Sequence, residues 1–297
     1  MTTIQDTTVR APARTMSEKL VRFAGRAPTH IILALIALVW LVPSIGLLIT
    51  SFRPSADMRA TGWWTVLFEP RFTLDNYERV ISGEGMGQAF LNSIIITVPS
   101  TILPLIIASL AAYALAWVKF PFRDAIFLII IGLLIVPVQV GFVPLVVAFR
   151  ESGTGLLTGH GAIWLTHTAF ALPFGIFLLR NFFITLPKDL IEAARIDGAS
   201  NVGIFRTIIV PLSVPAIAAY GIFQFLWVWN DLLMALVFVQ RNDLQPMPVR
   251  VTGLLGTYAT EWSLLAAAAF LIMVVPLVVF FSLQRYFVQG LLAGSVK

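Results

Sequence analysis

Asp231 is the only acidic residue that interrupts a long apolar stretch of this chain. It ends the run Gln224-Phe-Leu-Trp-Val-Trp-Asn-Asp, directly after Trp229 and Asn230. Burying an ionisable group in apolar surroundings costs free energy, so such a group usually has a role. Trp229, Asn230 and Asp231 are therefore candidates either for a substrate path or for a polar contact between helices. A single acid is fewer than an ion-coupled carrier usually needs.

Other chemistry has little support in the composition. The 297 residues include no cysteine, so thiol catalysis, disulfides and Cys-ligated zinc are excluded. None of the four lysines follows a glycine, and neither H-E-x-x-H nor G-x-S-x-G occurs, so the sequence lacks the signatures of a P-loop ATPase, a zinc protease and a common hydrolase. His160 and His167 lie at and just inside the start of an apolar run, where helix packing and a ligand contact both stay open.

The segment 181–210 has the clearest pattern of local signals. Pro187 is typical of the first turn of a helix, and Asp189 and Glu192 place negative charge near the N-terminus, where the helix dipole favours it. Gly198 predicts the C-terminal cap of this helix. The spacing therefore predicts a short helix that ends in a glycine turn.

A second helix is expected directly after this turn. Ser200 or Asn201 can cap its N-terminus. Its apolar positions are Val202, Phe205, Ile208 and Ile209, and it runs to Pro211. The small residues Ala193, Ala194 and Ala199 permit close approach of another surface. The helix–turn–helix either docks onto another protein or packs on its own bundle, and spacing alone leaves both open.

The elements that position these residues are expected to be membrane helices. Of the chain, 58% is hydrophobic and 12% is charged, against about 25% charged residues in an average soluble domain. A helix needs about 20 apolar residues to cross a bilayer. Six uncharged runs meet or approach this length: Ile31–Thr50, Ala89–Val118, Ala125–Phe149, Ala162–Leu179, 211–240 with its break at Asn230 and Asp231, and Trp262–Leu283.

The charges predict an orientation for these spans. With the N-terminus inside, the inner segments carry thirteen basic and six acidic residues, and the outer segments carry seven and eight. The positive-inside rule then places both termini in the cytoplasm. The net charge of +5 is thus mostly a topology signal, and nucleic acid is not an expected partner.

This topology divides the chain into five parts. They are a cytoplasmic tail 1–29, a first transmembrane helix 30–51, an extracytoplasmic loop 52–88, a core 89–284 with five spans and the cytoplasmic segment 181–210, and a cytoplasmic tail 285–297. The basic region before the first span is long and no A-x-A-like cleavage site follows, so this span reads as a retained anchor.

The cytoplasmic segment resembles the EAA loop of ABC importer permeases. The family pattern is E-A-A, a glycine four residues after the second alanine, and then I-x-L-P. The string Glu192-Ala-Ala-Arg-Ile-Asp-Gly-Ala-Ser-Asn-Val-Gly-Ile-Phe-Arg-Thr-Ile-Ile-Val-Pro211 matches it in register and departs only at Val210, where leucine is usual. Motifs at Asn92–Ser93, Ala111–Tyr113, Trp229–Asn230 and 284–297 resemble the carbohydrate-uptake branch, the second permease of maltose-type transporters. The run Gln224–Asp231, together with Gln284–Gly290, resembles α-glucoside permeases most.

The resemblance implies an all-α fold of six transmembrane helices, the type I ABC importer permease, in a bacterial or archaeal cytoplasmic membrane. It implies three kinds of protein partner. A second homologous permease pairs with the chain, two copies of a cytoplasmic ATPase bind below, and an extracytoplasmic sugar-binding protein docks above. The residues implied in ATPase coupling are Glu192, Ala193, Ala194, Arg195, Asp197, Gly198, Ala199, Phe205 and Pro211. Glu192 is expected to hold the short helix by pairing with Arg195 or with another basic group nearby.

The resemblance also implies where other contacts fall. The segment 241–261 is expected to reach the binding protein through Gly253, Gly256 and Thr257, and the tail near 294–297 to touch the ATPase. No cofactor or metal is expected in this chain, because ATP and magnesium would be bound by the ATPase. In maltose-type pairs the sugar is held mainly by the other permease.

The function that follows is a non-catalytic permease subunit that moves a sugar, an oligosaccharide or α-glucoside, by alternating access. The alternative within the same class is an importer for another small polar solute, such as a polyol or a glycerol derivative. A membrane-embedded enzyme would need a buried acid–base set, nucleophile or metal that the sequence does not show. A secondary carrier would transport without an ATPase.

Overall fold

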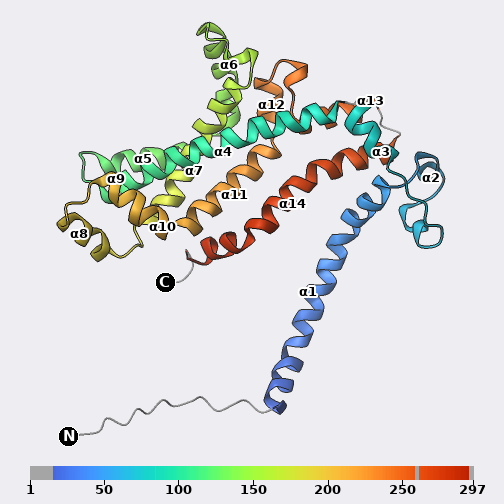
Figure 1. The fold of residues 1–297 in the computed structure, drawn as a ribbon, viewed down its shortest axis with the longest axis horizontal. Coiled ribbons are helices and arrows are strands. Elements are labelled where there is room, and N and C mark those ends of the chain that lie inside the picture. The colour runs from blue at the N-terminus through green and yellow to red at the C-terminus, as the bar shows by residue number, and fades with distance from the viewer. Residues whose placement is uncertain (1–15, 84, 258–260, 294–297) are drawn as a thin grey trace.

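The computed structural model describes residues 16–83, 85–257 and 261–293, and these form helices joined by short loops. Four helices are long and apolar enough to cross a membrane: α1 (Met16–Ser51), α4 (Met86–Trp117), α7 (Gly161–Phe183) and α14 (Trp262–Ala293). The helix α11 (Val214–Trp229) lies with α4, α7 and α14 in one bundle, as Figure 1 shows. The expected all-α membrane fold is confirmed at this level.

The third expected span, Ala125–Phe149, is not one straight helix. It is divided into α5 (Arg123–Leu133), the 3-10 turn η3 (Val138–Gly141) and α6 (Phe142–Glu151), and the two arms meet at 94°. Pro137 lies at the break, where it has no N–H to give to a continuing helix. The prediction of a continuous helix here is therefore wrong, and α6 points away from the bundle in Figure 1.

A second bend precedes α11. The segment of α9 (Asn201–Ile204), the π-turn η5 (Phe205–Ile209) and α10 (Val210–Leu212) meets α11 at 78°. Within the described residues, the candidate spans thus number four, or up to six if each bent pair is one span. At the other end of α11, α12 (Leu233–Phe238) starts after the break at Asn230 and Asp231.

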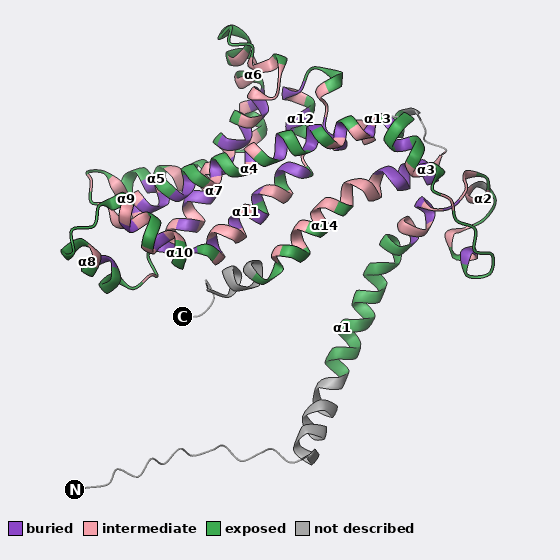
Figure 2. Ribbon diagram, in the orientation of Figure 1, coloured by how far each residue is buried: buried purple, intermediate pink, exposed green. Residues whose placement is uncertain are grey.

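Helix α1 lies apart from the bundle for most of its length (Figure 1). It begins at Met16, within the segment expected as a tail, and its apolar part is Pro28–Ser51. Only 6% of its most apolar window is buried, and Figure 2 shows that its middle is exposed. An apolar, unburied helix of 24 residues has the length and surface of a membrane span.

Small residues let the bundle helices pack closely. Gly175 of α7 faces Tyr220 of α11, and a Cβ atom on this glycine would lie 2.3 Å from the phenol ring carbon Cζ. The Tyr220 hydroxyl donates to the Ala171 carbonyl at 3.0 Å. Ala108 and Ala112 of α4 are fully buried in the same cluster. Close backbone approach of this kind is how helices associate in membranes.

The loops between the spans carry short helices. They are α2 (Ser55–Ala60), η1 (Trp63–Leu67), α3 (Asp75–Glu78) and the π-turn η2 (Arg79–Gly83) before α4, η4 (Leu156–Thr158) before α7, and η6 (Asn242–Leu244) and α13 (Met247–Thr257) before α14. Arg53, 4% exposed, organises the first of these loops by donating to the Gly62 carbonyl and the Thr61 hydroxyl at 2.8 and 2.7 Å.

Candidate functional site

The segment 181–210 contains a short amphipathic helix, α8 (Lys188–Ile196), which follows Pro187. One buried apolar side chain packs it against the bundle: Ile191 is 1% exposed and belongs to the cluster of α4, α7 and α11. Glu192, Ala193 and Ile196 are exposed, and Ile196 is 86% exposed. The helix therefore presents most of its surface outward at one end of the molecule (Figures 1 and 2).

A glycine turn ends α8. Gly198 has φ +79°, a left-handed conformation that costs other L-residues about 1–2 kcal/mol. The Ala199 N–H donates to the Ala194 carbonyl at 2.9 Å, and the Gly198 N–H donates to the Arg195 carbonyl at 3.1 Å. These two bonds form a Schellman motif, which satisfies the last carbonyls of a helix. The exposed Asp197 and Ala199 flank the glycine.

The second helix begins as the sequence indicates, at Ser200. Its hydroxyl accepts from the Gly203 N–H at 3.1 Å, which caps α9. The prediction of one regular helix to Pro211 differs from the structure, since η5 inserts a π-turn at 205–209, and Pro211 lies exposed in α10. Phe205 is half-buried with its ring centroid 5.4 Å from that of Tyr113 on α4.

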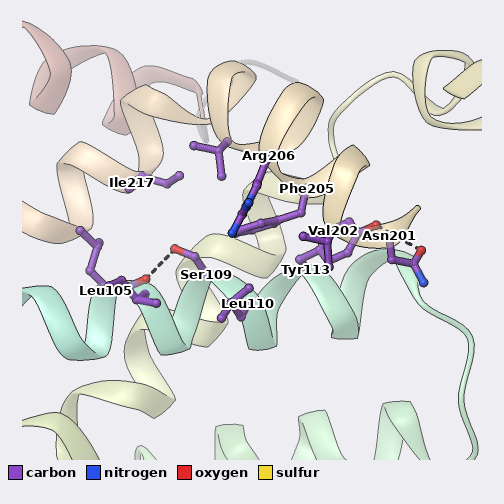
Figure 3. Close-up of a pocket in the computed structure, with 11 residues that line it drawn as sticks. Leu105, Ser109, Leu110, Tyr113, Asn201, Val202, Phe205, Arg206 and Ile217 are labelled. Atoms are coloured by element: carbon purple, nitrogen blue, oxygen red, sulfur yellow. Dashed lines mark hydrogen bonds between the residues drawn. The ribbon is translucent and has the colours of Figure 1, made fainter. Parts of the chain in front are cut away.

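An apolar groove of about 400 Å³ separates this second helix from α4. Figure 3 shows Phe205 and Arg206 on one side of it and Ser109 and Tyr113 of α4 on the other. The Tyr113 hydroxyl donates to the Asn201 side-chain oxygen at 3.4 Å. The segment thus touches α4 through Asn201 and Phe205.

Arg195 ties α8 to the ends of two bundle helices. Its guanidinium donates to the Trp117 carbonyl at 2.7 Å, at the C-terminus of α4. The Trp117 indole in turn donates to the Phe183 carbonyl at 3.1 Å, at the C-terminus of α7. The ion pair expected between Glu192 and Arg195 is absent among the described residues, because the Arg195 guanidinium bonds the Trp117 backbone carbonyl instead.

The three candidates at the α11 break have different surroundings. Trp229 is 1% exposed, and its indole donates to the Ile272 carbonyl of α14 at 3.0 Å, so it is a helix contact. Asn230 is exposed, and its amide donates to the Leu226 carbonyl at 2.8 Å. The Asp231 carboxylate accepts from the Met234 N–H at 3.4 Å and so caps α12.

Asp231 also has a neighbour that sequence reasoning missed. His167 of α7 places Nε2 3.5 Å from Asp231 Oδ2, with the side chains 2% and 13% exposed. Both atoms are buried, and neither has a hydrogen-bond partner. They lie 64 positions apart in sequence, so no local pattern pairs them; the position of His167 inside an apolar run was the one available signal.

The residues expected to face the binding protein lie on α13. Gly253 and Gly256 are exposed, and Thr257 ends the helix with a side chain outside the described residues. The tail 294–297 also lies outside them. Asn92 of α4 holds the loop before α13 by donating to the Asp243 and Gln245 carbonyls at 2.8 and 3.1 Å. The loop's Arg241 guanidinium hydrogen-bonds Asp243 and lowers the pKa of that carboxyl.

This geometry defines a class of protein: a helical membrane permease with an exposed helical element suited to docking. Within the described part of the chain, no three His, Asp or Glu side chains gather as metal ligands would. The chain belongs to the family "Binding-protein-dependent transport system inner membrane component", whose profile matches residues 104–292. It is a non-catalytic, multi-pass inner-membrane subunit of an ABC transporter, which works with a binding protein and an ATPase.

Curated relatives and solved structures agree with this family. The chain is 51% identical to the osmoprotective compounds uptake permease GgtD of Synechocystis sp. over 93% of both chains. It is 49% identical to the α-glucoside transport permease AglG of Rhizobium meliloti, over 83% of this chain and 68% of that one. A chain of a bacterial ABC transporter that imports alginate has the same fold, with a TM-score of 0.72 at 23% identity over 93% of this chain and 100% of that one.

Proposed function

We propose that this permease imports a sugar, an oligosaccharide or α-glucoside, together with a second homologous permease, two copies of a cytoplasmic ATPase and an extracytoplasmic sugar-binding protein. Both termini lie in the cytoplasm in this arrangement, as the charge distribution favours. ATP and magnesium are bound by the ATPase. The substrate class is supported by relatives named for α-glucosides and for melibiose, raffinose and stachyose.

The observation that carries the proposal is the geometry of α8. A helix that is attached by Ile191 and Arg195 and otherwise exposed offers a surface for a cleft in another protein. Its apolar exposed residues, Leu190 and Ile196, would be costly to leave in water and are suited to burial in such a cleft. Motion of the docked helix would pass through Arg195 to the bundle.

A polyol or glycerol derivative is the second candidate substrate. It is favoured by one observation, the 51% identity to a permease named for osmoprotective compounds. Both substrates are small, uncharged and rich in hydroxyl groups, so one pathway chemistry suits either. Competition between the two classes for the cognate binding protein distinguishes them.

The proposal is tested with the complete transporter in proteoliposomes. Radiolabelled sucrose, maltose and trehalose are offered with the binding protein outside and ATP inside, and uptake is expected to stop when the ATPase carries a catalytically dead substitution. Because the chain contains no cysteine, Ala193→Cys provides a single thiol on α8 that is expected to crosslink to the ATPase. Uptake that persists with the dead ATPase would overturn the proposal.

A matched control for the crosslink lies on the same helix. Ile191→Cys has its thiol buried against the bundle and should not crosslink. A crosslink of equal yield from both positions would show that α8 is loose and does not present one face to the ATPase.

A further inference from the structure

Two cavities adjoin each other beside the break in α11. One, of about 380 Å³, lies between α5, α7 and α11 and is lined by His167, Phe174 and Gln224 among others. The other, of about 360 Å³, lies under the α5–α6 bend and is lined by Gln139, Asn230 and Asp231. Both are lined by Val138, Trp227 and Met234, so these residues mark the boundary between them.

Trp227 is the aromatic side chain at this boundary. It is 57% exposed, whereas Trp229, two residues later, is 1% exposed and hydrogen-bonded to α14. The described residues offer no hydrogen-bond partner to the Trp227 indole N–H. An indole needs such a partner when it is enclosed, and its flat apolar face also needs cover. Trp227 thus presents an apolar ring face and an unbonded indole N–H group where the two cavities meet.

Hydrogen-bonding groups lie around this ring. Asn230 and Gln139 are exposed amides, and Asn230 uses its side-chain N–H group to bond the Leu226 carbonyl, which leaves its side-chain oxygen to accept. Asp231 is on the same wall and is backed by His167 at 3.5 Å. The buried Oδ2 of Asp231 and Nε2 of His167 lack hydrogen bonds, which is costly unless a small rearrangement or an incoming hydroxyl completes them.

This combination fits a carbohydrate better than a lipid chain or a protein helix. A sugar ring presents C–H groups on its faces and hydroxyls on its rim, which match an indole plate surrounded by amides and a carboxylate. An acyl chain would leave the Gln139 amide, the Asn230 side-chain oxygen and Asp231 Oδ2 without partners, and burial of unpaired polar groups is unfavourable. Binding sites of this kind pair aromatic walls with a few placed polar groups.

We propose that Trp227, Asn230, Asp231 and Gln139 form a sugar-contacting site on this permease, with His167 as the residue that positions Asp231. The inference rests on the proposed function and departs from one expectation, that sugar is held mainly by the other permease. In this proposal, the break after α11 directs Asn230 and Asp231 toward the sugar, while the hydrogen bond of Trp229 holds α11 against α14.

The first experiment measures sugar moved per ATP hydrolysed by the complete transporter in proteoliposomes. The probe is whichever of radiolabelled sucrose, maltose and trehalose the wild type imports fastest. Trp227→Ala is expected to lower this ratio by about fivefold or more, the scale of one lost aromatic contact, while ATP hydrolysis stimulated by the loaded binding protein stays within about twofold of wild type. Trp227→Phe, which keeps a plate and loses the N–H, is expected to fall between the two.

Trp40→Ala is the control, because it removes an indole that is even more exposed, at 77%, from α1. An unchanged ratio in Trp227→Ala, or an equal loss in Trp40→Ala, would overturn the site. A parallel loss of uptake and ATP hydrolysis would overturn it too, since it would show a role in assembly. If the wild type imports none of the three sugars, the proposed function itself fails.

The second experiment reads the site directly. In the cysteine-free chain, Gln139→Cys is expected to react with a charged methanethiosulfonate more slowly when the transporter is turning over the imported sugar. Ser152→Cys, exposed in the loop after α6, should react at the same rate with and without sugar. Equal reaction rates at position 139 with and without sugar would also contradict the proposal.

Discussion

Replacing Gly198 should uncouple ATP hydrolysis from transport without preventing insertion. Its φ of +79° is left-handed, and a Cβ atom there would meet nothing within 4 Å. The only cost of Gly198→Ala is therefore conformational, about 1–2 kcal/mol. That cost lowers the population of the native turn relative to other conformations by about 5- to 30-fold. Gly198→Val adds a branched Cβ and is expected to cost more.

The assay compares uptake with ATP hydrolysis in proteoliposomes, and the amount of inserted permease is measured in parallel. Gly198→Asn is expected to recover most of the coupling, because asparagine tolerates the left-handed region. Gly132→Ala is the matched control: its Cβ also meets open space, but its φ is not positive. Wild-type uptake by Gly198→Val, or an equal loss in Gly132→Ala, would refute the reasoning.

Three further substitutions test the packing that positions the site. Ile191→Ala removes the buried anchor of α8 and should destabilise that helix by about 2–3 kcal/mol, seen as faster hydrogen exchange over 188–196, whereas Ile196→Ala should leave exchange unchanged and weaken ATPase binding. Gly175→Ala should lower the Tm of the purified permease, since its Cβ would overlap a phenol ring, and Gly221→Ala, with no contact under 3.8 Å, should not. Asn92→Ala leaves two loop carbonyls without their donor and should speed exchange at 242–247; unchanged exchange there would contradict this role.

Local signals made the docking segment predictable. The cap at Ser200, the glycine turn at Gly198 and the helix start at Pro187 each depend on residues within five positions along the chain, so the local sequence contains what sets each of them. The π-turn at 205–209 has no such signal, because it arises where the segment packs on α4 and bends into α11.

Apart from the bend between α5 and α6, the missed features depend on contacts between distant parts of the chain. Pro137 is a local signal for the bend between α5 and α6. It lies within an uncharged apolar run long enough for one span, and this run length favoured the interpretation as a single helix. Arg195 binds a backbone carbonyl 78 residues away, and any residue type supplies a carbonyl, so no pattern could favour it over Glu192. Likewise Trp227 and Trp229 have the same side chain in the same run, and only the bundle decides which is buried.

Arg195 and Gly198 both restrain the same conformation of α8, so the effects of replacing them are expected to depend on each other. The turn sets the direction of α8, and the bond to Trp117 fastens that direction to the ends of α4 and α7. When the Arg195 bond alone is lost, the Gly198 turn still sets the direction of the helix, so Arg195→Gln alone should lower coupling only slightly. With Gly198→Ala also present, no restraint except Ile191 remains, and the combined loss of coupling should exceed the sum of the two single effects expressed as free energies. Additive losses would mean that the two residues act on separate steps, and that α8 does not transmit motion as one rigid element.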